Sequence, residues 1–276
     1  MKQGKTITTY LIDGTPTGLR TVFISNKNCK ALIVPRSSMD KIKDRDESLQ
    51  PSLYFLLNDD ENKIYIGESE NFNQRIKNHI KKKNFWNLAI TFFSQNNDLT
   101  KADVKYLEYL SIAAVNKTGN IDIEENSQKP TCPNLPEHQK SSMDEFFEDV
   151  KLIIGFAGYN FLTEINKENK ENLYYCKRND IDAKAIFADN KIIVLKDSKI
   201  SAKEERYYNL KNYKREDLIK SNKVKNLDDN FMITVQDIIF NSPSSASSFC
   251  LGKSSNGWTN WKNVKNKTLD EVIRKG

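Results

Sequence analysis

Histidine and cysteine are scarce in this sequence, and their scarcity removes several kinds of site. Only two histidines occur among 276 residues, His79 and His138. We therefore expect no metal cluster built on histidine. The four cysteines lie far apart and include no CxxC pair, so we expect reduced thiols rather than a zinc site or a disulfide framework.

Long apolar runs are also missing. No stretch of about 18 apolar residues occurs, so we expect no membrane span. The first residues, MKQGKTITTYLIDG, lack the apolar core of a signal peptide, and we therefore expect a cytoplasmic location. The mean hydropathy is low, at −0.67, but 10% of the residues are aromatic, which favours a folded, soluble protein over a disordered one.

Neither sign of charge dominates the composition. Lysine and arginine together number 43 and the acidic residues 37, which gives a net charge of +6. This balance is compatible with a polyanionic partner but does not require one. The excess of positive charge is larger in residues 196–225, which contain ten basic and five acidic residues. A solvated helix over residues 201–222 is the first interpretation of this segment, and a nucleic-acid contact is the alternative.

The pattern of apolar residues predicts an α/β (α+β) fold with a small antiparallel sheet. Residues 5–36 alternate apolar and polar positions and predict a β-meander, which forms an N-terminal β extension. A central sheet of three strands, flanked by helices, is expected to follow. Its predicted strands are Leu53–Leu57, Lys63–Gly67 and Leu88–Phe93, and its predicted helices are 71–82 and 101–117.

A proline-rich segment suggests where a first domain ends. Residues 120–140 contain three prolines and few large apolar side chains, which is typical of a linker. We therefore predict a first domain over residues 1–140 and a second α+β domain over 141–276. The second domain is expected to begin with a helix over 141–156 that Ser142 caps, followed by several short strands.

The C-terminal part contains a second recognisable helix start. Ser242 followed by Pro243 is typical of a cap and a first helical turn. Trp258 and Trp261 follow a turn at Asn256-Gly257. We favour a core position for both tryptophans, while an exposed stacking platform for bases remains the alternative.

Five residues on the predicted central elements could perform chemistry together. Tyr54 and Tyr65 lie at like places on two neighbouring strands. Arg75 and His79 are four residues apart and share one face of the next helix. Glu108 lies at the edge of the apolar stripe of helix 101–117. Taken singly, each of these residues is ordinary in its element.

The segment from residue 52 to 126 resembles the GIY-YIG nuclease family. Tyr65-Ile66-Gly67 matches the second half of the family motif, and Ser52-Leu53-Tyr54 stands at the first half. Arg75 follows ten residues after Tyr65, where family members carry an arginine, and Glu108 looks like the family's metal-binding acid. His79 falls where members carry a tyrosine or a histidine. The resemblance implies a small three-stranded sheet and an endonuclease that acts on DNA.

The same resemblance implies a role for each residue of the site. Glu108 would bind one Mg²⁺ or Mn²⁺, and Arg75 would hold the scissile phosphate. Tyr54 would act as the base that activates water. Tyr65 would orient the water or the phosphate, and His79 would share the role of base or position it.

Further residues are implied to contact the substrate. Gly67 would let the substrate approach the backbone. Lys77 suits a phosphate backbone, although a lysine near a helix C-terminus is also favourable without a ligand. A polar residue that completes the site would be Asn126 or, less favoured, Asn120.

Two departures from the family pattern leave other functions open. Ser52 replaces a glycine, and Glu68 stands where many members have lysine. A catalytically degenerate nucleic-acid-binding protein is therefore the first alternative. A structure-specific or RNA-directed phosphodiesterase is the second.

The C-terminal pattern also has a counterpart. Residues 240–261, FNSPSSASSFCLGKSSNGWTNW, resemble an uncharacterised domain that follows GIY-YIG modules in a bacterial subgroup. We interpret the second domain as an accessory part that binds or positions the substrate. No sequence feature indicates the oligomeric state.

Overall fold

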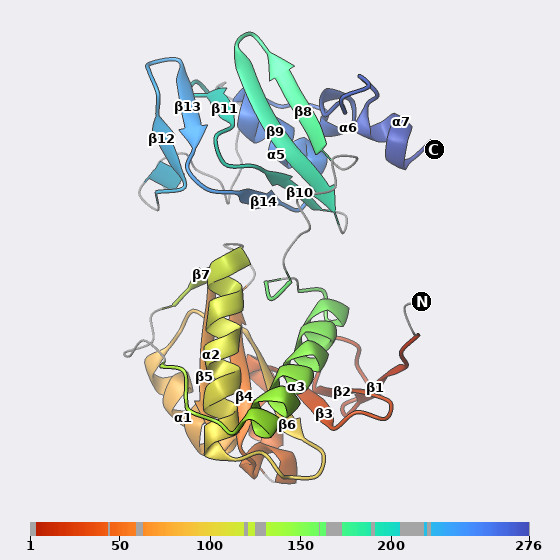
Figure 1. The fold of residues 1–276 in the computed structure, drawn as a ribbon, viewed down its shortest axis with the longest axis vertical. Coiled ribbons are helices and arrows are strands. Elements are labelled where there is room, and N and C mark those ends of the chain that lie inside the picture. The colour runs from red at the N-terminus through yellow and green to blue at the C-terminus, as the bar shows by residue number, and fades with distance from the viewer. Residues whose placement is uncertain are drawn as a thin grey trace. The chain divides into compact units, whose positions relative to one another are not determined.

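The computed structural model consists of two compact units, Met1–Glu164 and Ile165–Gly276. It describes residues 4–43, 45–58, 63–118, 121–124, 131–159, 161–163, 173–188, 191–204, 218–219 and 222–275. Figure 1 shows the elements of both units, which are described separately below. None of the helices in these residues is long and apolar enough to cross a membrane.

The sheet of the first unit has seven strands within the described residues, in the order β1-β2-β3-β6-β4-β5-β7. Their bounds are Ile7–Leu11 (β1), Arg20–Ile24 (β2), Cys29–Pro35 (β3), Ser52–Asn58 (β4), Lys63–Ser69 (β5), Leu88–Ser94 (β6) and Asp122–Ile123 (β7). All neighbours are antiparallel except β5 and β7. The predicted three-stranded sheet is the group β6-β4-β5, and the N-terminal strands continue that same sheet through β3.

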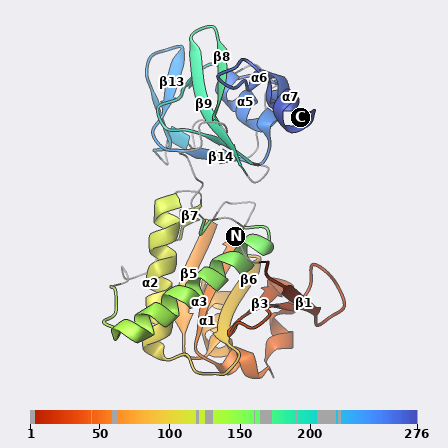
Figure 2. The same ribbon diagram turned by 45° about the vertical axis from the view of Figure 1, so that its right-hand side comes forward.

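Helices cover both faces of this sheet. They are the 3-10 helices η1 (Arg36–Ile42) and η2 (Asp46–Leu49) and the α-helices α1 (Phe72–Lys82), α2 (Lys101–Thr118) and α3 (Glu137–Phe156). Helices α2 and α3 share one buried cluster with the sheet, while α1 and η1 share the other. Figures 1 and 2 show α2 and α3 on the same side of the sheet. The α+β class and the N-terminal strands are confirmed.

Helix α1 forms where its sequence provides a cap and an apolar stripe. Asn71 caps the helix, because its side chain accepts a hydrogen bond from the backbone N–H of Gln74. Phe72 and Ile76 are four residues apart and are both buried against the sheet. The helix ends at Lys82, and three basic residues in its last turn suit the helix dipole. Arg75 and His79 lie on the face of α1 beside this apolar stripe, next to the sheet.

Helix α3 begins earlier than the sequence predicted. It starts at Glu137 with Pro136 as its N-cap, so the predicted start at a Ser142 cap is wrong. The Ser142 hydroxyl instead donates to the carbonyl of His138 inside the helix. The predicted domain boundary after residue 140 falls within α3, whereas the first compact unit extends to Glu164.

The sheet of the second unit has the order β12-β13-β11-β9-β10-β14, and β8 pairs with β9. The strands are Leu173–Arg178 (β8), Ile181–Ala188 (β9), Lys191–Val194 (β10), Lys199–Ser201 (β11), Val224–Asn226 (β12), Phe231–Thr234 (β13) and Ile238–Phe240 (β14). The helices are α5 (Pro243–Leu251), α6 (Gly257–Asn260) and α7 (Leu269–Ile273).

The predicted cap at Ser242 is confirmed, since its side chain accepts a hydrogen bond from the backbone N–H of Ser245. Most of the predicted helix over 201–222 lies outside the described residues.

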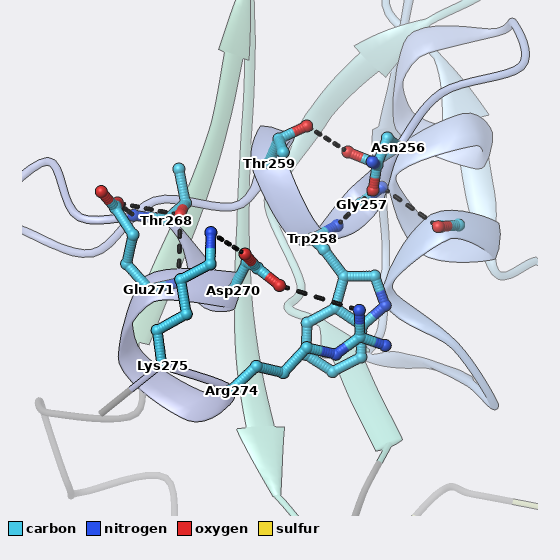
Figure 3. Close-up of polar contacts among 10 residues, drawn as sticks. Asn256, Gly257, Trp258, Thr259, Thr268, Asp270, Glu271, Arg274 and Lys275 are labelled. Atoms are coloured by element: carbon cyan, nitrogen blue, oxygen red, sulfur yellow. Dashed lines mark hydrogen bonds and ion pairs between the residues drawn. The ribbon is translucent and has the colours of Figure 1, made fainter.

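The two C-terminal tryptophans are packing residues. Trp261 is fully buried, and its indole N–H donates to the carbonyl of Pro243 over 3.1 Å. Trp258 is half-buried, with its ring in edge contact with Phe187 and with Arg274 over its face at 3.6 Å. Figure 3 shows this stacking of Arg274 on Trp258. The core prediction is therefore confirmed for Trp261, and the rings do not form an open stacking platform.

Candidate active site

Tyr54 and Gly67 face each other across the β4–β5 hairpin. They are direct cross-strand partners, so their side-chain positions lie on the same face of the sheet. A Cβ built on residue 67 would lie 2.5 Å from the Tyr54 hydroxyl oxygen and 2.9 Å from Cε1 of Tyr65. The Tyr54 ring therefore lies over the Gly67 backbone, in space that only glycine leaves open.

The hydroxyl of Tyr54 is the centre of a buried hydrogen-bond network. It lies 2.8 Å from Nε2 of His79, and it accepts a hydrogen bond from Nε of Arg75 over 3.1 Å. Tyr54 has no exposed surface. Burial, and then the neighbouring Tyr65, raise the pKa of Tyr54 far above its usual value, against the influence of Arg75. The resting hydroxyl is therefore protonated.

His79 accepts the hydrogen bond that the Tyr54 hydroxyl donates. Burial first, and then the positive charges of Arg75, Lys83 and Lys82, lower the pKa of His79 to about 4. The imidazole is therefore neutral at pH 7, and Nε2 accepts the hydrogen bond that the Tyr54 hydroxyl donates. This assignment is compatible with Arg75, which donates to the same oxygen.

Tyr65 and Arg75 complete the cluster. The ring of Tyr65 lies 6.1 Å from that of Tyr54 and 4.8 Å from that of His79, measured between centroids. Arg75 also hydrogen-bonds to the Tyr65 side chain. The ammonium group of Lys83 lies 4.5 Å from the centroid of the Tyr65 ring. One guanidinium thus joins both tyrosines, and Arg75 as a residue is exposed.

Glu108 lies on α2, on the side of the sheet opposite to the tyrosine cluster. Its carboxylate accepts a hydrogen bond from the backbone N–H of Glu68, the residue after Gly67 on β5. Burial first, and then the negative charge of Glu68, raise the pKa of Glu108 to about 7, while Arg75 acts in the opposite direction. The tyrosine cluster and the acid therefore flank the same end of β5, within electrostatic range of each other.

The donor set at this point fits a hydrated divalent cation. No group of three or more metal-ligating side chains occurs within the described residues, so an all-protein cage is not available there. A half-buried carboxylate with a second acidic residue beside it is the kind of site that a cation stabilises. Mg²⁺ commonly uses one or two carboxylates and keeps several waters. Glu108 could hold such an ion.

Two parts of the chain match known families. Residues 50–129 match the family described as GIY-YIG catalytic domain. The first unit carries a GIY-YIG domain. Residues 174–273, which span β8 to α7, match a family described as domain of unknown function DUF4357. No curated protein and no solved structure matches the chain.

The GIY-YIG domain brings most of the predicted site residues together. Tyr54, Tyr65, Arg75 and His79 are in mutual contact, and Gly67 lies beneath the Tyr54 ring. Glu108 lies on the other side of β5, within electrostatic range of Arg75. The catalytic roles of these residues remain predictions.

Lys77, a predicted substrate contact, does not join this group. Lys77 is exposed and follows Arg75 by two residues, which rotates it about 200° around α1, away from the cluster. Asn126 lies outside the described residues, as does Asn120. Ser52 is buried opposite Ser69, and its hydroxyl has no hydrogen-bond partner within the described chain.

Lys83 is the residue of this site that sequence reasoning did not single out. It is the C-cap of α1 and follows several lysines, so the sequence alone made it one of a basic group. Its ammonium group covers the Tyr65 ring and lowers the pKa of His79. The available signal was its position directly after the predicted helix, where the chain turns back toward the sheet.

Proposed function

We propose that this protein is a divalent-metal-dependent endonuclease that hydrolyses phosphodiester bonds in DNA. The observation that carries the proposal is the position of Arg75. Its guanidinium hydrogen-bonds to both tyrosines and lies within electrostatic range of Glu108, and Arg75 is an exposed residue. A phosphate placed against this guanidinium would lie between the tyrosine cluster and the acid.

Each residue then has a distinct task. The guanidinium of Arg75 would bind the oxygens of the scissile phosphate and stabilise the charge that develops there. The Tyr54 hydroxyl would accept a proton from the attacking water while it passes its own proton to Nε2 of His79. Since the buried tyrosine is a poor base alone, the neutral imidazole at 2.8 Å is what makes the pair an acceptor.

Tyr65 and Glu108 would orient the reactants. Tyr65, held by Arg75 and covered by Lys83, would position the water or a phosphate oxygen. Glu108 would hold Mg²⁺ or Mn²⁺, which when bound would neutralise charge on the phosphate. DNA is the substrate that the family resemblance favours, and RNA is the alternative that a parallel assay distinguishes.

The test is cleavage of supercoiled plasmid by the purified chain with Mg²⁺ or Mn²⁺, with an RNA of equal length in parallel. We expect Arg75→Ala and Glu108→Gln each to reduce the rate on the order of 100-fold. Gln74→Ala, on the exposed part of α1, and Glu148→Gln, on α3, are matched controls and should cleave like the wild type.

Three other outcomes of this assay would each contradict part of the proposal. Cleavage that survives both Arg75→Ala and Glu108→Gln would show that the site is elsewhere. DNA binding without cleavage under any metal condition would favour the catalytically degenerate binder. Faster cleavage of RNA than of DNA would change the substrate class.

A further inference from the structure

The excess positive charge of the protein is concentrated in its second unit. Residues 165–276 contain 22 basic and 15 acidic residues, whereas residues 1–164 contain 21 basic and 22 acidic ones. The unit that carries the GIY-YIG domain thus has no net positive charge with which to attract a polyanion. The second unit, with a net charge of +7, is where such attraction would arise.

The strand register of the second sheet places several of these basic residues on one face. Helix α5 packs on the opposite face, and Figure 1 shows it behind β9 and β8. Direct partners in an antiparallel sheet share a face. The strand register runs across five strands in a single row of such partners: Lys225, Ile233, Lys199, Asp182 and Lys177.

A second row lies two residues along the strands. Lys184 pairs with Tyr175 on β8, and Tyr175 pairs with Lys262 just beyond the edge of the sheet. The backbone hydrogen bonds between Tyr175 and Lys262, at 2.8 and 3.0 Å, fix this register. Both lysines of this row are exposed. We call the five lysines of the two rows the lysine face: Lys177, Lys184, Lys199, Lys225 and Lys262.

The lysine face is open and almost free of opposite charge. Four of its lysines are exposed, and Lys199 is half-buried. Asp182 is the one acidic side chain in the two rows, and it lies 3.6 Å from the ammonium group of Lys177. The far end of the same sheet face is closed, since Ile186 and Ile193 are buried there. The accessible part of the face is therefore its basic end.

Two aromatic side chains lie among these lysines. Tyr175 and Phe231 are half-buried on the same face. The ammonium group of Lys177 lies 5.3 Å from the centroid of the Tyr175 ring, and that of Lys199 lies 3.9 Å from the centroid of Phe231. Flexible lysines on rings can move to phosphates and leave the ring faces to bases. The face thus offers both charge and stacking surface.

We propose that the lysine face binds a single-stranded segment of DNA, with phosphates on the lysines and bases against Tyr175 and Phe231. Its first row crosses four strand spacings, about 19 Å, which is a broad and continuous surface. The major groove of a duplex admits a helix or a two-stranded ribbon, not a sheet of this width. Single strands present unstacked bases and suit a basic, aromatic sheet face. The choice of DNA rests on the proposed function.

Fluorescence anisotropy of the full chain with a labelled oligonucleotide, in a chelating buffer that prevents metal-dependent cleavage, tests this surface. The variant Lys184→Ala/Lys225→Ala/Lys262→Ala changes only exposed side chains of the face. We expect its affinity for single-stranded DNA to fall about tenfold at moderate salt, and the slope of log affinity against log salt to fall by about 2. The matched control is Lys203→Ala/Lys265→Ala/Lys267→Ala, three exposed lysines of the same unit outside the two rows.

The control variant shows whether a loss of affinity for DNA comes from the lysine face itself or only from the lower net charge of the protein. Equal losses in both triple variants, or no loss in the first, would overturn the proposal. Tighter binding to duplex DNA or to RNA than to single-stranded DNA would overturn the assigned ligand. Because no cleavage is measured, loss of nuclease activity would leave this result unaffected, and a failure here would leave the cleavage assay unaffected.

Discussion

At the scale of single residues, two positions of the family motif have different structural requirements. Residue 67 lies directly under the Tyr54 ring, where a Cβ would overlap the hydroxyl and Cζ, at 2.5 and 2.6 Å. Residue 52 lies two positions before Tyr54 and is buried opposite Ser69, and a serine is accommodated there. The glycine that positions the tyrosine is therefore retained, and the departure at Ser52 does not disturb the cluster.

The Gly67→Ala substitution should damage both stability and cleavage. Tyr54 is fully buried and has no space to retreat, so the extra carbon would force the ring or β5 to shift. We expect the free energy of unfolding to fall by about 1–3 kcal/mol, together with a large loss of cleavage. Denaturant unfolding and the plasmid assay measure the two effects.

Gly155→Ala is the matched control for that substitution. Gly155 lies within α3, and a Cβ there would meet no atom within 4 Å. Alanine is the better helix former, so we expect the free energy of unfolding to rise by about 0.5–1 kcal/mol with cleavage unchanged. Similar destabilisation by both substitutions would show that the overlap at residue 67 is not the cause.

His79 should make stability depend on pH in a defined window. Burial, and then neighbouring positive charge, lower the pKa of His79 to about 4, below its ordinary value of 6.5. A histidine whose folded pKa is depressed stabilises the protein above about pH 6.5, and that contribution is lost as the pH falls toward 4. The loss attributable to this residue is about 3 kcal/mol.

The measurement is urea unfolding of the wild type and of His79→Gln between pH 7 and pH 4. The free energy of unfolding should fall less steeply in the variant, because its side chain does not titrate. His138→Gln removes the other histidine, which is exposed, and should follow the wild-type curve. A His79→Gln curve parallel to that of the wild type would refute the assignment of a buried neutral imidazole.

Two local arrangements in the candidate site were predictable from the sequence, because strand register and helical spacing determine them. The hairpin places Tyr54 opposite Gly67, and helical spacing places Arg75 and His79 on one face. The network that Tyr54 makes was not predictable, because it depends on how α1 packs on the sheet. The same holds for the contact of Lys83 with the Tyr65 ring, since no spacing rule links a helix C-cap to a strand.

At the scale of elements, the first sheet is larger than its family match. The match covers β4 to β7, yet β3 pairs with β6 over seven residues, and β1 and β2 extend the sheet further. Helix α3 also lies outside the match and buries five large apolar side chains: Phe146, Phe147, Val150, Ile153 and Ile154. Alternation predicted the N-terminal strands, but long-range pairing leaves no local pattern, so their attachment to β6 was not foreseen.

A truncation series tests the part that α3 plays. The fragment 1–164 retains α3 and should unfold cooperatively, whereas the fragment 1–140, which ends within α3, should not fold. Each buried apolar side chain lost contributes about 1.5–3 kcal/mol, so five of them match the whole stability of a typical domain. Circular dichroism during thermal unfolding compares the two. A cooperative transition in the 1–140 fragment would support the boundary predicted from the proline-rich segment.

At the scale of the whole molecule, the proposed active site and the proposed DNA-binding surface belong to different units. The cluster around Tyr54 and Arg75 lies in the unit whose net charge is −1, and the lysine face lies in the unit whose net charge is +7. Phosphate affinity depends on how many cations contact the backbone, while the rate of the chemical step depends on the geometry of the site. The two properties should therefore be separable by removing the second unit.

The fragment 1–164 should retain the chemical step and lose most of the affinity. Compared with the full chain, we expect kcat within a few-fold and KM for a DNA substrate with an unpaired segment raised about tenfold or more at moderate salt. The salt dependence of kcat/KM should also become shallower, because fewer counterions are released on binding. Full-length protein with the triple substitution on the lysine face is the intact comparison and should shift KM in the same direction. An unchanged KM and an unchanged salt slope in the fragment would mean that the first unit binds DNA by itself, and the second unit would then need another role.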